Sequence, residues 1–359
     1  MEKKIVLTGG GTAGHVTPNI ALLPELRNAG FEVSYMGSYD GIEKRLMEDY
    51  DVPYYGVATG KLRRYFDLKN LTDPFKIIKG YYEAKAHLKE INPSIVFSKG
   101  GFVSVPIVRA AHALHIPCII HESDITPGLA NKLCIPLAEK VCCNFPETVT
   151  YLPKGKSVLT GSPIRRELSE GTKEKGLSLC GFTSAKPVVL IIGGSLGARN
   201  INLTVRNALS QILKDFNIVH ICGKGYLDDT LNGIVGYKQF EYLKEDLKDV
   251  FAMADVVISR AGANSICELL ALKKPNLLIP LPASASRGDQ LLNAASFESQ
   301  GFSLVLHEED MTPDTLVQSL QELFCNRQSY IDNMTQSSQL NPIATIMGLI
   351  EEYRLKSLT

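Results

Sequence analysis

The chain has 359 residues, which is long enough for two α/β domains that each bury a core of their own. Its hydrophobic fraction is 45% and its formal net charge is zero, which fits an ordinary globular protein and leaves no global field to attract nucleic acid. The start Met1-Glu2-Lys3-Lys4 does not resemble a signal peptide, and no apolar run is long enough to span a membrane. Eight scattered cysteines without a C-x-x-C pair predict reduced, buried thiols in a cytosolic protein.

Short apolar runs alternate with amphipathic stretches through the first half of the chain. Asp40 followed by Glu43 has the spacing of a capping box at the start of a helix. Strand–helix alternation of this kind predicts a parallel sheet covered on both faces. The expected strands are residues 4–8, 32–36, 54–58, 95–98, 118–121 and 140–144, and the expected helices are 18–29, 41–50, 74–91, 105–114 and 128–133.

The alternation pauses near residue 163 and then restarts with a second apolar strand and glycine turn. We therefore expect an α/β protein of two Rossmann-like doubly wound domains, with the ligand in the cleft between them. The first domain should cover residues 1–163 and the second 164–340, and a last helix within 341–359 should pack back on the first domain. Strands of the second domain are expected at residues 187–192, 218–222, 238–241, 256–259, 276–279 and 303–306.

The first glycine-rich turn matches a dinucleotide-binding fingerprint only in part. Gly9, Gly11 and Gly14 follow a strand with G-x-G-x-x-G spacing. A nicotinamide-dependent dehydrogenase also needs an acidic residue at the end of its second strand, and Ser38 stands there. His15, a titratable residue directly after the third glycine, has no role in dinucleotide binding. This pattern argues against a dinucleotide, and no cofactor is expected.

Seven segments, four up to the hinge and three after it, form a recognisable series. They are GGTAGH at 10–15, KGGFVS at 99–104, HESD at 121–124, GSPIR at 161–165, GGSLGA at 193–198, SRAGA from 259 on to Glu268, and DQ with NA at 289–294. In order and spacing they resemble the MurG family of N-acetylglucosaminyltransferases, in glycosyltransferase family 28. The resemblance covers nearly the whole chain.

The resemblance implies a GT-B fold and an enzyme of peptidoglycan synthesis. Members transfer GlcNAc from UDP-GlcNAc, with inversion, to the C4 hydroxyl of undecaprenyl-pyrophosphoryl-MurNAc-pentapeptide (lipid I), which gives lipid II. They work as peripheral proteins at the cytoplasmic face of the cell membrane, and other cell-wall synthesis proteins are conceivable partners. Two departures stand out: Ala13 replaces a common glycine, and Ser123 and Asp124 replace the Gln-Asn of the commoner His-Glu-Gln-Asn segment.

The second half should carry most of the donor site. No Asp-x-Asp pair stands at a strand end, so we expect a helix N-terminus rather than a metal to hold the diphosphate. The segment that opens the helix after strand 256–259 supplies it. By resemblance, Glu268 accepts the ribose hydroxyls, although it could be a solvated helix acid, and Gln290 contacts the sugar, although it could be a first-turn helix residue. The residues expected to bind UDP-GlcNAc are Thr12, Ala13, Gly14, Arg165, Ser195, Lys244, Ala263, Asn264, Ser265, Glu268 and Gln290.

The first half should carry the acceptor side. His15 is expected to be the general base, since an imidazole titrates near neutral pH, or else only to bind the acceptor diphosphate or orient its hydroxyl. Gly100 and Gly101 are expected near the sugar or acceptor. Asp124 is expected there too, unless it is a loop or cap residue.

Two segments suggest contact with an anionic membrane surface. Residues 61–66 and the helix beginning near residue 74 combine basic and large apolar side chains. Phe75, Ile78 and Tyr82 share one helical face, flanked by lysines, which suits binding at a lipid interface. The same face could instead pack on the sheet.

Three other functions compete with this interpretation. A UDP-sugar-dependent glycolipid glycosyltransferase of the same fold would carry similar donor motifs. A hydrolysing epimerase on this scaffold would carry extra carboxylates and release UDP without an acceptor. A non-catalytic nucleotide-sugar-binding protein would release none.

Overall fold

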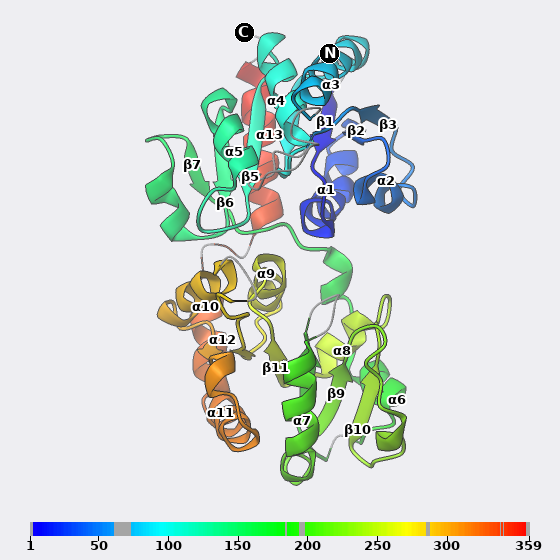
Figure 1. Ribbon diagram of the computed structural model, residues 1–359, viewed down its shortest axis with the longest axis vertical. Helices are drawn as coiled ribbons and strands as arrows, with labels where there is room; N and C mark the ends of the chain where they lie inside the picture. The colour runs from blue at the N-terminus through cyan, green and yellow to red at the C-terminus, as the bar shows by residue number, and fades with distance from the viewer. Residues whose placement is uncertain are drawn as a thin grey trace. The chain divides into compact units, whose positions relative to one another are not determined.

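The computed structural model describes residues 3–60, 73–183, 185–193, 198–284, 288–337, 339 and 341–356. It divides into two compact units (Figure 1). The N-terminal unit comprises Met1–Arg165 and Asn341–Thr359, and the C-terminal unit comprises Arg166–Leu340. Within the described ranges, no helix is both long enough and apolar enough to cross a bilayer.

The N-terminal unit is built on a seven-stranded sheet in the order β3-β2-β1-β4-β5-β6-β7, with every strand pair parallel. Its strands are β1 (Lys4–Thr8), β2 (Glu32–Ser38), β3 (Tyr54–Val57), β4 (Ile95–Ser98), β5 (Cys118–Glu122), β6 (Lys140–Cys143) and β7 (Ser157–Leu159). Its helices are η1 (Ala13–His15), α1 (Thr17–Asn28), α2 (Ile42–Met47), α3 (Asp73–Ile91), α4 (Ser104–Ala113), α5 (Leu129–Cys134), η3 (Ile135–Leu137), η4 (Pro146–Tyr151) and α13 (Pro342–Lys356).

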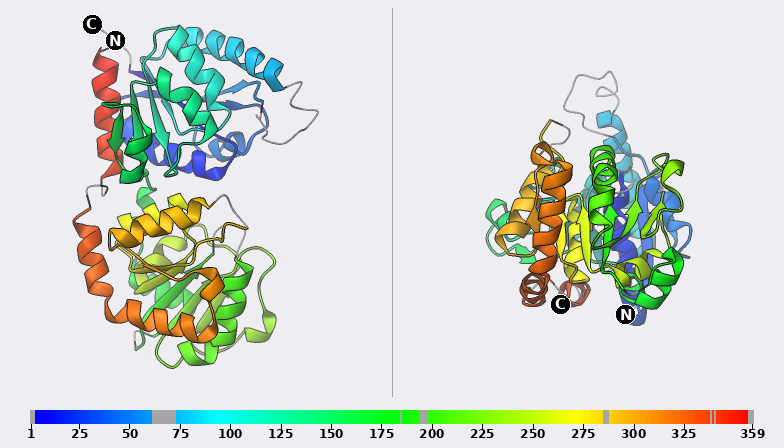
Figure 2. Two further views of the ribbon diagram at one scale, coloured as in Figure 1. Left: turned by 60° about the vertical axis from the view of Figure 1, so that its left-hand side comes forward. Right: turned by 90° about the horizontal axis from the view of Figure 1, so that it is seen from below.

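Helices cover both faces of this sheet, because its strands are apolar on both sides. Successive strand residues point to opposite faces. Ile5 and Leu7 therefore enter one core cluster, while Val6 enters the other. The last helix, α13, adds Ile346 and Ile350 to the cluster of Ile5, and it lies along the N-terminal unit in red in Figure 2.

The C-terminal unit repeats this plan with a six-stranded parallel sheet in the order β10-β9-β8-β11-β12-β13. Its strands are β8 (Val188–Ile192), β9 (Asn217–Ile221), β10 (Tyr237–Phe240), β11 (Val256–Ser259), β12 (Asn276–Leu278) and β13 (Leu304–Val305). Its helices are η5 (Arg166–Ser169), α6 (Lys173–Cys180), α7 (Arg199–Ile212), α8 (Leu247–Met253), α9 (Ala263–Ala271), α10 (Asp289–Ser299), α11 (Pro313–Cys325), α12 (Arg327–Thr335), η6 (Asp229–Leu231) and η7 (Glu308–Asp310).

The strand order reverses at the same place in both sheets, between β1 and β4 and between β8 and β11. In open parallel sheets, ligands bind beyond the carboxyl ends of the strands at such a switch point. The predicted fold class of two Rossmann-like doubly wound sheets is confirmed. We therefore expect the ligand-binding residues on the loops after these four strands.

Two local predictions are wrong. The helix expected at 41–50 is shorter, and its N-cap is Gly41 without a side-chain cap, so Asp40 and Glu43 form no capping box. Glu43 is buried and turns toward the glycine loop instead. Seven cysteines are buried free thiols, but Cys325 at the end of α11 is exposed, because it lies on the solvent side of that helix.

Candidate functional site

The loops after β1 and β4 are locked together by a close backbone approach. The Gly10 N–H donates to the Gly100 carbonyl at 3.2 Å. Gly101 has φ +87°, and a Cβ atom there would lie 2.2 Å from the Gly10 carbonyl oxygen. Only glycine fits such a position, because it tolerates positive φ and has no side chain to collide. The KGGF segment therefore shapes the β1 loop.

Glu43 holds the same loop from α2. Its carboxylate accepts from the Gly11 N–H at 3.1 Å, from the Ser38 N–H at 3.0 Å and from the Ser38 hydroxyl at 2.5 Å. A buried carboxylate needs such donors to offset its lost hydration. The sequence pattern suggested a capping role and missed this one, which depends on contacts between β2, α2 and the loop.

His15 ends η1 and is half-buried. Its Nδ1 lies 3.1 Å from the Lys99 carbonyl oxygen, so Nδ1–H donates and Nε2 carries the lone pair. Burial, and then the positive charge of Lys99, lower the pKa of His15 from 6.5 to about 4. The imidazole is therefore neutral at pH 7 and can accept a proton at Nε2.

Lys99 follows β4 and is fully buried. Its Nζ lies 2.8 Å from His121 Nδ1 and 2.5 Å from Ser123 Oγ. His121 Nε2–H in turn donates to the Gly161 carbonyl at 2.9 Å. Burial first, and Lys99 second, hold the pKa of His121 well below its usual value. The sequence alone does not indicate a role for Lys99, because only the fold brings His121 on β5 and Ser123 directly after it to its side chain.

Asp124 lies in the turn after β5 and is half-buried. Glu122 shapes this turn, accepting from the Asp124 N–H at 2.9 Å, the Gly128 N–H at 3.0 Å and the Asn131 amide at 2.8 Å. Gly100, Gly101 and Asp124 therefore lie on turns after the adjacent strands β4 and β5. Their contact with the acceptor stays a prediction.

The rest of the first glycine loop is open to solvent. Thr12 and Ala13 are exposed and Gly14 is half-buried. Their backbone is therefore accessible to a ligand, and their contact with UDP-GlcNAc also stays a prediction.

In the C-terminal unit, the structure gathers four of the predicted donor residues on α9, labelled in Figure 1. Gly262 is the N-cap, and Ala263, Asn264 and Ser265 form the first turn directly beyond β11. These three residues and Glu268, about one turn further on, are all partly exposed. The first N–H groups of a helix attract anions, so this turn can hold a phosphate at the switch point.

Gln290 stands in the first turn of α10, and its Oε1 accepts from the Leu281 N–H at 3.1 Å. Asn293, one turn on, donates to the Ala261 carbonyl at 3.1 Å. Helix α10 is thereby tied to the loop that precedes α9. The predicted Gln290 thus lies on an element fixed next to the α9 turn.

Arg260 lies directly after β11, at the carboxyl ends of the same strands. It forms an ion pair with Glu308 and donates to the Ile279 carbonyl at 3.1 Å. Both side chains are largely buried, so the pair joins β11, β12 and η7. Arg260 lies within the SRAGA motif, but the sequence does not indicate its partner, since Glu308 is distant in sequence.

The remaining predicted donor residues are Lys244, Arg165 and Ser195. Lys244 is exposed after β10, with β9 and β8 between that strand and β11. Arg165 is half-buried and is the last residue of the N-terminal unit before Arg166 opens the other. Ser195 lies outside the described residues, as do residues 61–66. In the parts that the structure describes, no group of three His, Cys, Asp or Glu side chains is placed to hold a metal ion.

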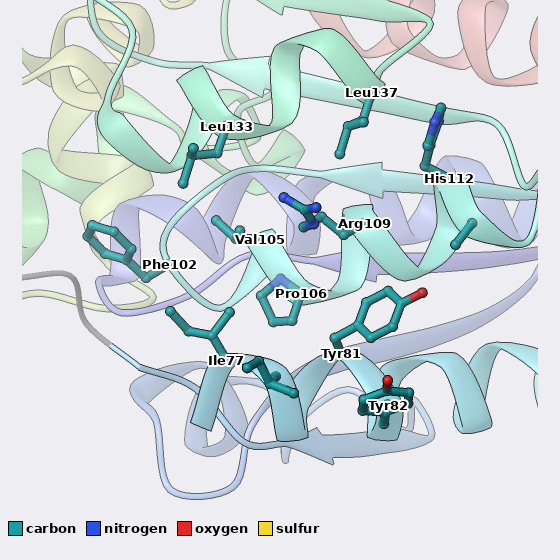
Figure 3. A pocket seen from close by; sticks show the side chains of 12 residues that line it. Ile77, Tyr81, Tyr82, Phe102, Val105, Pro106, Arg109, His112, Leu133 and Leu137 are labelled. Atoms are coloured by element: carbon teal, nitrogen blue, oxygen red, sulfur yellow. The ribbon is translucent and has the colours of Figure 1, made fainter. Parts of the chain in front are cut away.

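An apolar groove of about 620 Å³ lies on the N-terminal unit between α3, α4 and the α5–η3 segment (Figure 3). Ile77 and Tyr81 line it from α3, Phe102 from the turn before α4, Pro106 from α4 and Leu133 from α5. The outer face of α3 is exposed: Phe75 by 74%, Ile78 by 54% and Tyr82 by 65%. The alternative that this face packs on the sheet is wrong, because α3 turns other residues, such as Ala84 and Leu88, inward.

Two family models match the chain. The Glycosyltransferase family 28 N-terminal domain matches residues 5–143, and the Glycosyltransferase family 28 C-terminal domain matches residues 188–349. Together they include the strands of both sheets except β7.

Similar proteins extend over the full length. The UDP-N-acetylglucosamine--N-acetylmuramyl-(pentapeptide) pyrophosphoryl-undecaprenol N-acetylglucosamine transferase of Lachnospira eligens is 63% identical, over 98% of this chain and 99% of its own. The protein of the same name from Lachnoclostridium phytofermentans is 60% identical, over 99% and 100%. The crystal structure of Acinetobacter baumannii MurG has a TM-score of 0.78 at 30% identity, covering 98% of this chain and 99% of that one.

A more distant likeness concerns one of the competing functions. A putative UDP-N-acetylglucosamine 2-epimerase from Listeria monocytogenes has a TM-score of 0.66 at 13% identity, which shows a shared fold alone. The family models, by contrast, match most of the chain, and the relatives share more than half of its residues. This chain belongs to glycosyltransferase family 28.

Proposed function

We propose that this chain transfers GlcNAc from UDP-GlcNAc to the C4 hydroxyl of undecaprenyl-pyrophosphoryl-MurNAc-pentapeptide, which converts lipid I into lipid II. The observation that carries the proposal is full-length identity of 60–63% to two transferases named for this reaction. The aligned regions include both sheets and the loops described above. The enzyme is an inverting hexosyltransferase of peptidoglycan synthesis.

The donor binds the C-terminal unit at the switch point between β8 and β11. The first turn of α9 points its N–H groups at the diphosphate and stabilises the negative charge that grows as UDP leaves. Glu268 accepts the ribose hydroxyls, and Gln290 contacts the sugar. The backbone near Lys244 reads the uracil, and Arg165 and Ser195 add donors to the phosphates.

His15 acts as general base on the acceptor side. The acceptor oxygen attacks C1 of GlcNAc, the bond from C1 to the UDP oxygen breaks, and Nε2 of His15 takes the hydroxyl proton. The hydrogen bond from Nδ1–H to the Lys99 carbonyl supports this role, since it leaves the lone pair on Nε2. A pKa of about 4 makes His15 a weak base, so its proton uptake accompanies formation of the new bond.

The exposed face of α3 attaches the enzyme to the cytoplasmic surface of an anionic membrane, where its acceptor lies. Phe75, Ile78 and Tyr82 enter the interface, and Lys76 and Lys79 meet the headgroups. The neighbouring groove starts at Phe102, directly after the loop that supports His15, which suits a lipid-linked acceptor. Vesicle flotation tests this: the chain should float with anionic vesicles and less with neutral ones.

A matched pair of variants makes that test specific. Replacing Phe75, Ile78 and Tyr82 by serine should abolish flotation. Val235→Ser removes a 93% exposed apolar side chain from the C-terminal unit and should leave flotation unchanged. Absence of binding by the unaltered chain would refute the membrane surface.

The reaction is tested by incubating the chain with UDP-GlcNAc, with and without a lipid I analogue. We expect UDP release only when the analogue is present, with GlcNAc recovered on it. Release without acceptor would indicate an epimerase, and no release would indicate a binding protein. Transfer to diacylglycerol but not to the lipid I analogue would indicate a glycolipid transferase.

A further inference from the structure

Glu43 is a buried acid for which three glycines make room. It lies in the first turn of α2 and is 1% exposed. A Cβ atom on Gly10 would lie 2.5 Å from its carboxyl carbon, and one on Gly37 would lie 2.9 Å from its Cγ. A Cβ atom on Gly41 would also collide with the carboxylate. Three segments therefore lack a side chain around one carboxylate: the β1 loop, β2 and the start of α2.

The carboxylate of Glu43 joins two of these segments. Its Oε2 accepts from the Gly11 N–H at 3.1 Å, and its Oε1 accepts from the N–H and the hydroxyl of Ser38. Gly11 itself is exposed, so packing does not hold it in place. A hydrogen bond to a carboxylate is charge-assisted and stronger than one between neutral groups. The contact with Glu43 therefore fixes a residue that the core does not reach.

Gly11 lies at the turn that leads to His15. Its φ of +85° is a conformation that favours glycine, and η1 follows two residues later with His15 as its last residue. The turn is held on one side by the Gly10 N–H, which donates to the β4 loop, and on the other side by Glu43. His15 has its own tie, from Nδ1–H to the Lys99 carbonyl. Both the start and the end of this short loop are thus hydrogen-bonded to neighbouring elements.

We propose that Glu43 is a positioning residue for the transfer reaction: its carboxylate fixes the turn at Gly11 and thereby holds His15 where Nε2 meets the acceptor hydroxyl. This rests on the proposed function, in which His15 is the general base. A general base must lie within hydrogen-bond reach of the proton that it takes, and a glycine-rich loop is flexible by composition. The proposal explains why three segments leave space for an acid that is itself closed off from solvent.

Glu43→Gln tests the proposal, because it keeps the size of the side chain but replaces one acceptor oxygen by an NH₂ group. Gly11 and Ser38 each present an N–H to a different oxygen, so one of them must face the NH₂ group whichever way the amide turns. The kcat of transfer to a water-soluble lipid I analogue should fall by about tenfold or more, since small displacements of catalytic groups are costly.

Calorimetry of the Glu43→Gln variant with UDP-GlcNAc separates positioning from a loss of fold. The Kd of the donor should change by less than about twofold, because most of the donor site lies on the C-terminal unit. Partial unfolding would instead reduce the number of donor sites by the same factor as kcat, and that result would contradict positioning.

A double-mutant cycle with His15→Ala shows whether Glu43 acts through His15. If it does, Glu43→Gln should lower kcat by less than about twofold once the imidazole is gone. An equal loss in both backgrounds would overturn the proposal. Glu43→Asp repeats the cycle with the charge retained, since a side chain one methylene shorter does not reach both Gly11 and Ser38. Circular dichroism shows which variant keeps its fold, and either one decides the matter.

Glu83→Gln is the matched control. Glu83 lies on α3 of the same unit, and its carboxylate also accepts from a backbone N–H, that of Ala58, at 2.7 Å. Ala58 follows β3, and β2 lies between that strand and β1. This variant should transfer sugar at the rate of the unaltered chain. The proposal is overturned if Glu83→Gln lowers kcat as much as Glu43→Gln, or if Glu43→Gln leaves kcat unchanged.

NMR of the full chain labelled with ¹⁵N-glycine keeps this result apart from the proposed function. The Gly11 amide signal is identified by its loss in Gly11→Asn. It should move upfield in Glu43→Gln, because its acceptor has lost its charge, and should stay in place in Glu83→Gln. A Gly11 signal that does not move would show that Glu43 does not hold the loop. If the unaltered chain transfers no sugar, the proposed function fails, whereas this signal still reports what Glu43 does to the loop.

Discussion

At the scale of single residues, the N-terminal site depends on buried charges of opposite sign. Glu43 accepts from the Gly11 N–H, Nζ of Lys99 contacts His121 and Ser123, and the Lys99 carbonyl accepts from His15. Neither buried side chain would be stable there without such partners. They keep a glycine-rich loop, flexible by composition, in one conformation with the imidazole neutral.

Replacing His15 tests the base directly. His15→Ala should lower kcat by a factor of about 100 or more, the usual contribution of a general base, without weakening binding of UDP-GlcNAc to the C-terminal unit. His15→Gln keeps a donor for the Lys99 carbonyl but cannot take a proton. Transfer kinetics and calorimetric donor titration check both. Near-normal turnover of the His15→Ala variant would exclude His15 as the general base. Activity in the His15→Gln variant but not in His15→Ala would indicate that His15 orients the acceptor hydroxyl.

At the scale of elements, the loops beyond neighbouring strands build the site together. The carbonyl of Gly100 accepts from Gly10, and Gly101 leaves no room for a side chain against Gly10. In the C-terminal unit, Asn293 and Arg260 tie the loops after β11 and β12 to the helices that follow. In both units the strands fix the loop positions, and polar contacts fix the loop shapes.

Gly101→Ala should disrupt the N-terminal loops. The new Cβ would meet the Gly10 carbonyl at a positive φ, so we expect a loss of more than about 1 kcal/mol in stability. Transfer should fall by about 100-fold, because small displacements of catalytic groups are costly. Gly128→Ala is the control: its φ is −64° and a Cβ there would meet nothing within 4 Å. Equal activity of the two variants would contradict the interlocking of these loops.

At the scale of the whole molecule, the sheets of the two units share the same type of strand order, and α13 packs on the N-terminal unit. Both sheets reverse direction after their third strand in sequence, so each unit places its loops at one switch point. Neutral histidines occur in both: half-buried His15 and buried His121 in the N-terminal unit, and buried His220 in the C-terminal unit.

These histidines should make the protein sensitive to acid. Burial lowers the pKa of His220 to about 3 and holds that of His121 well below 6.5. As the pH falls, these two histidines are therefore protonated in the unfolded chain before they are protonated in the folded one. The stability present above pH 6.5 is lost as the pH falls toward the pKa values of the folded state. At pH 5 the protonation of His220 in the unfolded chain should cost about 2 kcal/mol of stability, and His121 should lower the stability in the same direction.

Urea unfolding at pH 7.5 and pH 5, followed by circular dichroism because the chain has no tryptophan, measures this loss. His220→Gln should reduce the difference between the two pH values. His307→Gln, which changes an exposed histidine of the same unit, should not. Equal stability of the unaltered chain at both pH values would contradict the prediction.

The sequence by itself determined the fold class and the order of most elements. A run of five or six apolar residues, such as 187–192, has the length of a strand and predicts a buried one, independently of which helices pack on it. A glycine turn after such a run marks the carboxyl end of the strand. The motif series also indicated the family. These features depend only on neighbouring residues or on the order of motifs along the chain, so they can be recognised without the tertiary structure.

Only the tertiary structure decided how the site residues are held. Glu43 was misread because its partners, Ser38 and Gly11, belong to different elements from its own. Lys99 was passed over because a buried lysine cannot be told from a surface one until β5 brings His121 to its Nζ. Hydrogen bonds and burial between residues distant in sequence set the charge state of His15, and a linear pattern carries no record of them.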